Sequence, residues 1–171
     1  MRLLLICHAA ASRDPHGIER LSDAALGRSR EVGRMLPPPR AAWTSPAPWA
    51  RQTAEALGLD AIVDDDLADW KAGLVGAESE RDFVARVGRW LTGREGGRGT
   101  LAAVTHATVV RACVTKALGV PAAGAPLIDI APCSVTELSF RAPRWHLAHV
   151  NWEPALLHIP RRRAPRRAKS A

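Results

Sequence analysis

The chain opens on Arg2-Leu3-Leu4-Leu5-Ile6-Cys7-His8-Ala9-Ala10-Ala11, a short apolar run that stops at a Cys-His pair followed by small residues. A run this short and this apolar predicts a central strand of a parallel sheet, covered on both faces. Ligands of open α/β sheets bind beyond the carboxyl ends of the strands. His8 stands where the run ends, so we predict that it belongs to a functional site, although a lone histidine could equally close a strand for structural reasons.

A second histidine has the same setting. The strand-like run 100–105 ends in His106, and residues 107–118 have helical spacing and stop at Gly119, a glycine of the helix-ending kind. Two strand-end histidines in one domain, each followed by small residues, favour an enzyme over a structural explanation of either histidine.

The rest of the chain alternates strand and helix signals over its first two-thirds. Residues 10–20 are predicted to be a polar loop, and helices are predicted over 22–36, 47–57 and from Ser79 onward. Further strands are predicted over 41–44, 61–63, 127–131, 134–140 and 145–150. This order predicts an α/β protein, a single domain built as a three-layer sandwich with a mainly parallel central sheet and helices on both faces.

Charge separates the body of the chain from its end. The net charge is +7, but residues 160–171 hold six of the 24 basic residues and no acidic residue, which leaves 18 basic and 17 acidic residues elsewhere. We therefore predict a domain over 1–159 and a basic, disordered tail over 160–171. The near-neutral body does not fit a nucleic-acid-binding module. The tail could contact nucleic acid or an acidic partner, but a solvated terminus is favoured.

Location and metal content follow from what the chain lacks. It has no apolar stretch long enough for a membrane span, and its three cysteines form no Cys-x-x-Cys pair, so we predict a cytoplasmic protein without a membrane partner. Cys7 and His8 are adjacent on a strand and point to opposite faces, and His146 and His149 have no partner cluster. With no glycine-rich nucleotide loop either, we predict neither a metal nor a cofactor.

Four motifs, in order, resemble those of the histidine phosphatase superfamily, also called phosphoglycerate-mutase-like, over residues 1–152. Cys7-His8-Ala9 stands where that family has Arg-His-Gly, and Thr105-His106-Ala107 where it has Thr-His-Gly. Residues 45–54, Ser-Pro-Ala-Pro-Trp-Ala-Arg-Gln-Thr-Ala, match Ser-x-x-x-Arg-Ala-x-x-Thr-Ala except at the arginine. Gly76-Ala77-Glu78-Ser79 is similar to a Gly-Gly-Glu-Ser segment that opens a helix.

The resemblance implies a small-molecule substrate and a set of roles. His8 would attack phosphorus and become a phosphohistidine, His106 would donate to the phosphoryl group, and Glu78 would be the general acid. Glu78 would need to hold its proton near neutral pH, which we expect a partly desolvated pocket to favour. A homodimer stays open, because members of the family often form dimers and an edge strand near the C-terminus could support one.

The departures fall on the phosphate clamp. Both expected arginines are replaced, by Cys7 and by Trp49. Losing one preorganised donor costs about 3–4 kcal/mol of transition-state stabilisation and losing two up to about 6–8 kcal/mol, a loss of roughly 10⁴- to 10⁶-fold in rate. Arg13 could stand in, whereas Arg51, about 200° around a helix from position 49, is expected to point elsewhere. The predicted substrate-binding residues are Cys7, Arg13, Trp49 and Ala107.

Two of the replacements have a double interpretation. Cys7 would be a small pocket-lining residue or, beside two histidines, an activated thiolate. Trp49 would turn a cationic wall into an aromatic one, suited to a less charged substrate or to a stacked ring. Three functions therefore stay open: a phosphatase with a rearranged clamp, a lyase, isomerase or hydrolase of a non-phosphorylated metabolite, and a non-catalytic binding relative. Retention of His8, His106 and Glu78 favours the first.

Overall fold

The first strand lies in the middle of the sheet, as its sequence predicts. The computed structural model describes residues 1–13, 19–70, 78–121, 125 and 127–154. In it β1 (Arg2–Cys7) is an inner strand of a six-stranded sheet of order β5-β4-β6-β1-β7-β8. Leu3, Leu5 and Ile6 are wholly buried. The other strands are β4 (Ala41–Thr44), β5 (Ala61–Val63), β6 (Thr100–Thr105), β7 (Val135–Arg141) and β8 (Arg144–Trp152).

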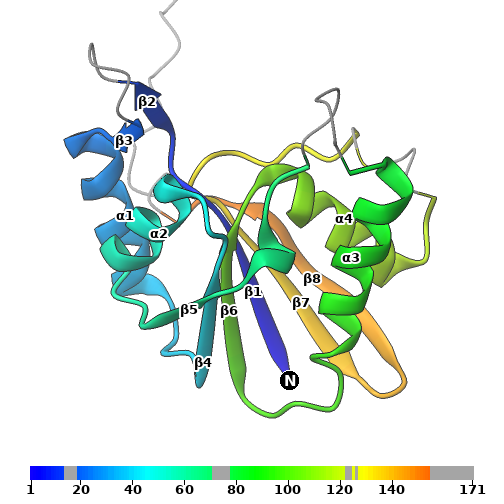
Figure 1. The fold of residues 1–171 in the computed structure, drawn as a ribbon. Coiled ribbons are helices and arrows are strands. Elements are labelled where there is room, and N and C mark those ends of the chain that lie inside the picture. Colours follow the sequence, from blue (N-terminus) through cyan, green and yellow to red (C-terminus); the bar gives the residue numbers. More distant parts are fainter. Residues whose placement is uncertain (14–18, 71–77, 122–124, 126, 155–171) are drawn as a thin grey trace, which may run out of the picture.

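Strand direction divides the sheet into two parts. β5, β4, β6 and β1 run parallel, so their carboxyl ends share the upper edge in Figure 1, whereas β7 and β8 are antiparallel additions. The parallel pairing sets β1 directly on β6, with Cys7 opposite Thr105. The two predicted strand-end histidines therefore leave the sheet side by side.

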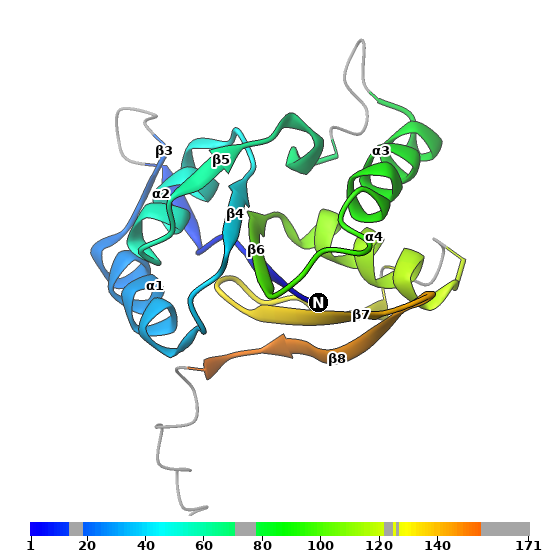
Figure 2. The same ribbon diagram turned by 90° about the horizontal axis from the view of Figure 1, so that it is seen from below.

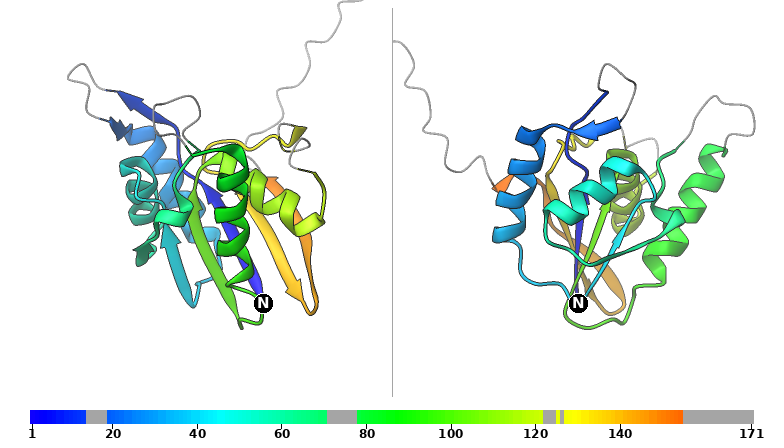
Figure 3. Two further views of the ribbon diagram at one scale, coloured as in Figure 1. Left: turned by 45° about the vertical axis from the view of Figure 1, so that its right-hand side comes forward. Right: turned by 60° about the vertical axis from the view of Figure 1, so that its left-hand side comes forward.

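Helices cover both faces of the sheet, which confirms the predicted three layers. α1 (Asp23–Met35) and α2 (Pro48–Ala56) lie on one face, and α3 (Glu80–Thr92) and α4 (Ala107–Leu118) on the other (Figure 2, Figure 3). Each face has its own apolar cluster, one joining β1 to α3 and α4, the other joining β1 to α1 and α2.

Local signals set the helix ends. The Ser22 side chain caps α1 by accepting from Ala25 N, and the Ser79 side chain caps α3 by accepting from Asp82 N. Gly119 ends α4 with a φ of 67°, a left-handed conformation that glycine adopts without strain. The starts predicted for α1 and α3 and the end predicted for α4 are confirmed.

Two predictions of local structure are wrong. Residues 127–131 form no strand; Leu127 is 87% exposed while Ile130 packs into the core, and the Ile128 carbonyl accepts from Arg111 Nε instead of from a neighbouring strand. The predicted loop 10–20 contains a two-stranded antiparallel sheet of β2 (Ala11–Arg13) and β3 (Glu19–Leu21), held to α2 by Leu21 N donating to Gln52 Oε1. The tail 160–171 lies outside the described residues.

The acidic segment after β5 forms an ordered turn. Asp65–Leu67 forms the 3₁₀ turn η1, capped by Asp64 Oδ1, which accepts from Asp66 N at 3.1 Å. Leu67 is wholly buried and fastens this turn to the core. Among the helices that the structure describes, none has the length and apolar character needed to cross a membrane.

The contact between α1 and α2 depends on a glycine, and two glycines of α1 test it. A Cβ on Gly33 would lie 2.3 Å from the Leu57 carbonyl oxygen, whereas a Cβ on Gly27 would meet nothing within 4 Å. We expect Gly33→Ala to lower the free energy of unfolding by about 1–3 kcal/mol, because the backbone at Leu57 must move away to make room for the added methyl group. Gly27→Ala is the matched control and should raise it by up to about 1 kcal/mol. Urea unfolding measures both, and equal effects would contradict the packing described.

Candidate active site

The site lies where β1 and β6 end. His8 follows β1 and His106 follows β6, and His8 N donates to the Thr105 carbonyl at 2.8 Å. The two imidazole rings meet edge-on, with centroids 5.0 Å apart and an interplanar angle of 71°. The structure thus brings together the two histidines that the sequence singled out.

The His8 ring is held in one tautomer. Its Nδ1 lies 2.8 Å from the Ala9 carbonyl oxygen, and because a carbonyl only accepts, Nδ1 carries the proton. Nε2 is then the atom with a free lone pair. Burial lowers the pKa of His8, while the Ala9 carbonyl and the Asp69 carboxylate act in the opposite direction. The ring is therefore neutral at pH 7 and can act as a nucleophile at Nε2.

The loop after His8 is anchored to α2. Ala9 N donates to Thr53 Oγ1 at 3.0 Å, and the same hydroxyl donates to the Trp49 carbonyl at 2.7 Å. Thr53 is wholly buried. This threonine, part of the 45–54 motif, fixes the carbonyl that selects the His8 tautomer.

His106 is buried and has a polar group facing each of its ring nitrogens. Its Nε2 lies 2.8 Å from Ser45 Oγ, and its Nδ1 faces Asp69 Oδ2 at 3.7 Å, which is long for a hydrogen bond. The carboxylate favours the proton on Nδ1, so the Ser45 hydroxyl donates to Nε2. Burial lowers the pKa of His106 to about 4; His8 and Arg86 add to this and Asp69 opposes it. His106 is therefore neutral at pH 7.

Asp69 is the carboxylate of the site, and sequence reasoning missed it. Its charge opposes the lowering of the pKa of both histidines by burial, and its Oδ1 accepts from Trp70 N and from the Thr108 hydroxyl. Its side chain is 47% exposed, so solvent or a ligand can reach it. The one feature of the sequence that could have pointed to Asp69 is its place two residues after Leu67, in a stretch without helix or strand periodicity.

Long-range bonds place the segment that carries Asp69. Thr105 Oγ1 donates to the Leu67 carbonyl at 2.7 Å, and Arg86 Nη1 donates to the carbonyls of Asp66 and Ala68 at 2.6 and 3.2 Å. One of these donors stands next to His106 in sequence and the other on α3. The strand end and the helix together aim the carboxylate at the histidines.

Glu78 is not the proton holder that we expected. Arg86 binds it with two parallel hydrogen bonds, Nε to Oε1 at 2.8 Å and Nη2 to Oε2 at 2.6 Å. The guanidinium lowers the pKa of Glu78, against a smaller opposing effect of burial. The expectation of a raised pKa is therefore wrong, because a cation eight residues away on α3 outweighs desolvation. Gly76 and Ala77 lie outside the described residues.

The replaced clamp positions are apolar. Cys7 is 4% exposed, and burial raises the pKa of its thiol to about 12, so the activated thiolate is wrong and Cys7 is a buried thiol at the end of β1. The Trp49 ring lies beside His8, with centroids 5.9 Å apart and a tilt of 53°. Ala107 is the half-buried first residue of α4.

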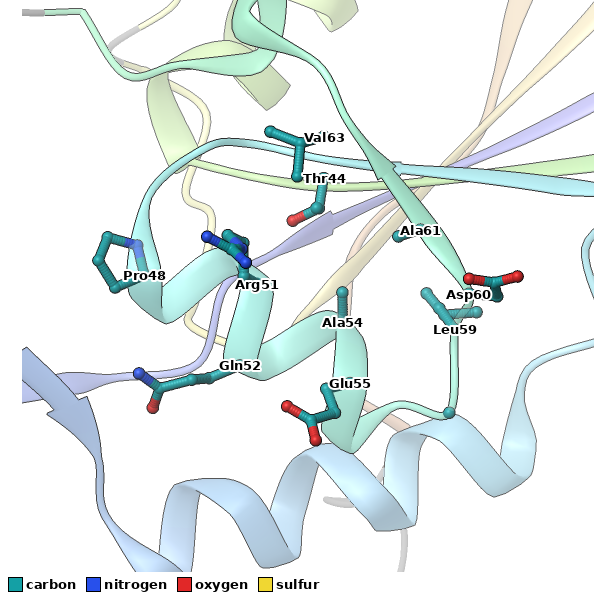
Figure 4. Close-up of a pocket in the computed structure, with 11 residues that line it drawn as sticks. Thr44, Pro48, Arg51, Gln52, Ala54, Glu55, Leu59, Asp60, Ala61 and Val63 are labelled. Atoms are coloured by element: carbon teal, nitrogen blue, oxygen red, sulfur yellow. The ribbon is translucent and has the colours of Figure 1, made fainter.

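Of the two candidate arginines, Arg51 is the one whose side chain the structure describes. The Arg13 backbone lies in β2, and its side chain lies outside the described residues. Arg51 lines a separate pocket between α2 and β5, as its helical position predicts (Figure 4). Of the charged groups that the structure describes, Asp69 is the one that shifts the pKa of His8. Within the same residues no group of three or more His, Cys, Asp or Glu side chains could hold a metal ion.

Comparison with known proteins shows which family and which folds the chain resembles. Residues 71–153 match the histidine phosphatase superfamily (branch 1). A search of curated proteins by sequence finds no match. The family match confirms the predicted resemblance to the histidine phosphatase superfamily over residues 71–153.

Solved structures carry the evidence on the fold. An alpha-ribazole phosphatase from Shigella flexneri is 15% identical, with a TM-score of 0.76 over 90% of this chain and 97% of the other. An H9A mutant of a phosphoserine phosphatase from Entamoeba histolytica, in complex with phosphoserine, is 13% identical, with a TM-score of 0.76 over 91% and 98%. A mycobacterial glucosyl-3-phosphoglycerate phosphatase in complex with VO3 is 19% identical, with a TM-score of 0.71 over 88% and 99%.

The buried His106 makes stability depend on pH. Its pKa is lowered from 6.5 in the folded protein, so between pH 6.5 and about 4 the unfolded chain binds a proton that the folded chain does not. We expect the free energy of unfolding to fall with falling pH across this window, by up to about 1.4 kcal/mol per pH unit from this residue. Urea unfolding of the wild type and His106→Gln from pH 4.5 to 7.5 measures it. The variant should show a shallower slope, and parallel slopes would contradict a neutral, buried His106.

Proposed function

We propose that the protein hydrolyses a small phosphomonoester by transferring its phosphoryl group to His8 Nε2. The observation that carries the proposal is the hydrogen bond between His8 Nδ1 and the Ala9 carbonyl, which leaves Nε2 unprotonated beside His106. Phosphatases with the same fold, among them a phosphoserine phosphatase and an alpha-ribazole phosphatase, support the reaction class. The substrate of each is a property of that protein.

The reaction runs in two steps. Nε2 attacks phosphorus, the bond from phosphorus to the ester oxygen breaks, and the leaving oxygen takes a proton. We assign that proton to solvent, which reaches the exposed edge of the site at Asp69, because Glu78 is ion-paired with Arg86. Water then attacks the phosphohistidine, gives a proton to solvent and releases inorganic phosphate.

The charge of the site sets the expected rate. A guanidinium suits a phosphoryl group because its planar fork donates two charged hydrogen bonds at once. Here Cys7 and Trp49 stand at the two clamp positions, His106 is neutral, and Asp69 repels a dianion. Any compensation would have to come from a residue such as Arg13. We therefore propose a slow phosphatase whose catalysis depends mainly on the positioned His8.

A second candidate function is chemistry on a substrate without a phosphoryl group. The observation in its favour is the neutral wall around His8, formed by the Trp49 ring and the neutral His106 ring. A lyase, isomerase or hydrolase would use His8 as base or nucleophile, and a binding relative would use the same wall without chemistry. A small-molecule ligand is common to all of these. A cytoplasmic location and a homodimer stay predictions.

Release of phosphate from a broad panel of phosphomonoesters tests the proposal. We expect turnover that is roughly 10⁴- to 10⁶-fold slower than that of an enzyme with a full clamp, and none for His8→Ala, since the nucleophile is gone. Acid-quenched samples should hold a phosphohistidine that the variant lacks. Turnover equal in both proteins, or none in either, would overturn the phosphatase proposal and favour the second candidate.

A charge-restoring variant is the second arm of this test. Trp49→Arg should raise kcat by about 10²- to 10³-fold, the worth of one preorganised donor. Trp49→Lys is the matched control, because it adds the charge without the planar fork and should gain less. If Trp49→Arg is no faster than the wild type, loss of the clamp is not what limits the rate.

A further inference from the structure

Acidic residues are concentrated in one stretch of the chain. Residues 52–70 contain no lysine or arginine but six of the 17 acidic residues, namely Glu55, Asp60, Asp64, Asp65, Asp66 and Asp69. This stretch runs from the end of α2 through β5, the strand at one edge of the sheet, to η1 and the residues just after it (Figure 1). We call the carboxylates of Glu55, Asp60 and Asp65 the acidic flank.

The acidic flank has no partner among the residues that the structure describes. All three side chains are exposed, and within the described residues none makes an ion pair or a hydrogen bond. Asp64 differs, since Arg94 and Trp90 both donate to it. Two members of the flank, Glu55 and Asp60, line the pocket of about 680 Å³ between α2 and β5 and come from either side of it (Figure 4). Arg51 lines the same pocket, so two carboxylates stand against one guanidinium, and the net negative charge that remains is suited to a cationic ligand.

The chain itself carries the complementary charge. Residues 161–169 hold six basic residues and no acidic residue. We propose that this basic segment docks on the acidic flank of its own chain. Besides its charge, the edge offers apolar contact, because Ile62 and Val63 of β5 are 65% and 48% exposed.

The path of the chain permits this docking. Arg28 of α1 binds Glu153, so the described chain ends beside α1; α1 packs against α2, and α2 against β5 (Figure 2). Arg161 is seven positions and Lys169 fifteen positions beyond Pro154 in the chain, an extended reach of roughly 25 to 50 Å. A folded chain of this length has a radius of gyration of about 16 Å. The basic residues can therefore reach β5 across α1 and α2.

The physics of the contact determines how it is tested. Exposed ion pairs are individually weak and are screened beyond about 8–10 Å at physiological salt. Docking through several pairs on one tether is intramolecular, so it is independent of protein concentration and is lost at high salt. A second copy would offer the same basic segment, but its docking would depend on concentration.

Carbodiimide crosslinking of the full chain tests the proposal, because it joins carboxylates to amines without a spacer. Lys169 is the one lysine of the segment, and the chain has only Lys71 and Lys116 besides. At low salt and low protein concentration we expect Lys169 to crosslink to Glu55, Asp60 or Asp65, as read by mass spectrometry. In 1 M salt the yield should fall by about tenfold or more.

Two charge-matched variants and an isotope mixture decide the outcome. Glu55→Gln/Asp60→Asn/Asp65→Asn should lose the crosslinks, whereas the control Glu31→Gln/Glu80→Gln/Asp129→Asn, also exposed, should keep them. Equal yields in the two variants, absence of Lys169 crosslinks, or a yield unchanged by salt in the wild type would each overturn the proposal. Crosslinks between ¹⁴N- and ¹⁵N-labelled copies would overturn it in favour of docking between copies.

Discussion

The register of β1 on β6 is the constraint on which the site depends. Cys7 lies opposite Thr105, and the hydrogen bond from His8 N to the Thr105 carbonyl continues this pairing one residue past the strand. Both histidines therefore leave the sheet at the same height, and their rings meet. A shift of one residue would turn the side chains of β1 to the opposite face and separate the pair.

Burial, rather than charge, then sets the chemistry of the pair. It lowers the pKa of both rings, and the one described charge that shifts His8, the Asp69 carboxylate, does not offset it. Backbone and hydroxyl partners hold the two rings in place: the Ala9 carbonyl holds His8, Ser45 holds His106, and Thr53 joins the loop after His8 to α2. Two neutral histidines and an exposed carboxylate make a site for nucleophilic chemistry with weak attraction for a dianion.

The sequence predicted those parts whose cause is local. A run of buried apolar residues predicted β1, serine caps predicted the starts of α1 and α3, and the position of two histidines at strand ends predicted that they share an edge. It could not predict Asp69, because the contacts that aim this side chain come from Thr105 and Arg86, far along the chain. The prediction that Glu78 holds a proton failed for the same reason. The pKa of Glu78 depends on the Arg86 guanidinium, about two helical turns into α3, and the spacing of the motifs does not reveal this contact. The strand predicted at 127–131 is wrong because Ile130 packs into the core while Leu127 is exposed. The Ile128 carbonyl accepts from Arg111 rather than from a neighbouring strand.

Nitrogen-15 chemical shifts of the imidazole rings, followed from pH 4.5 to 8, test the central claim most directly. The account predicts that at pH 7 His8 is neutral, with its proton on Nδ1 and a free lone pair on Nε2, and that it titrates below 6.5. His8→Gln identifies its signals. A proton on Nε2 at pH 7, or an imidazolium there, would contradict the account, because the atom assigned to attack phosphorus would then have no lone pair to offer.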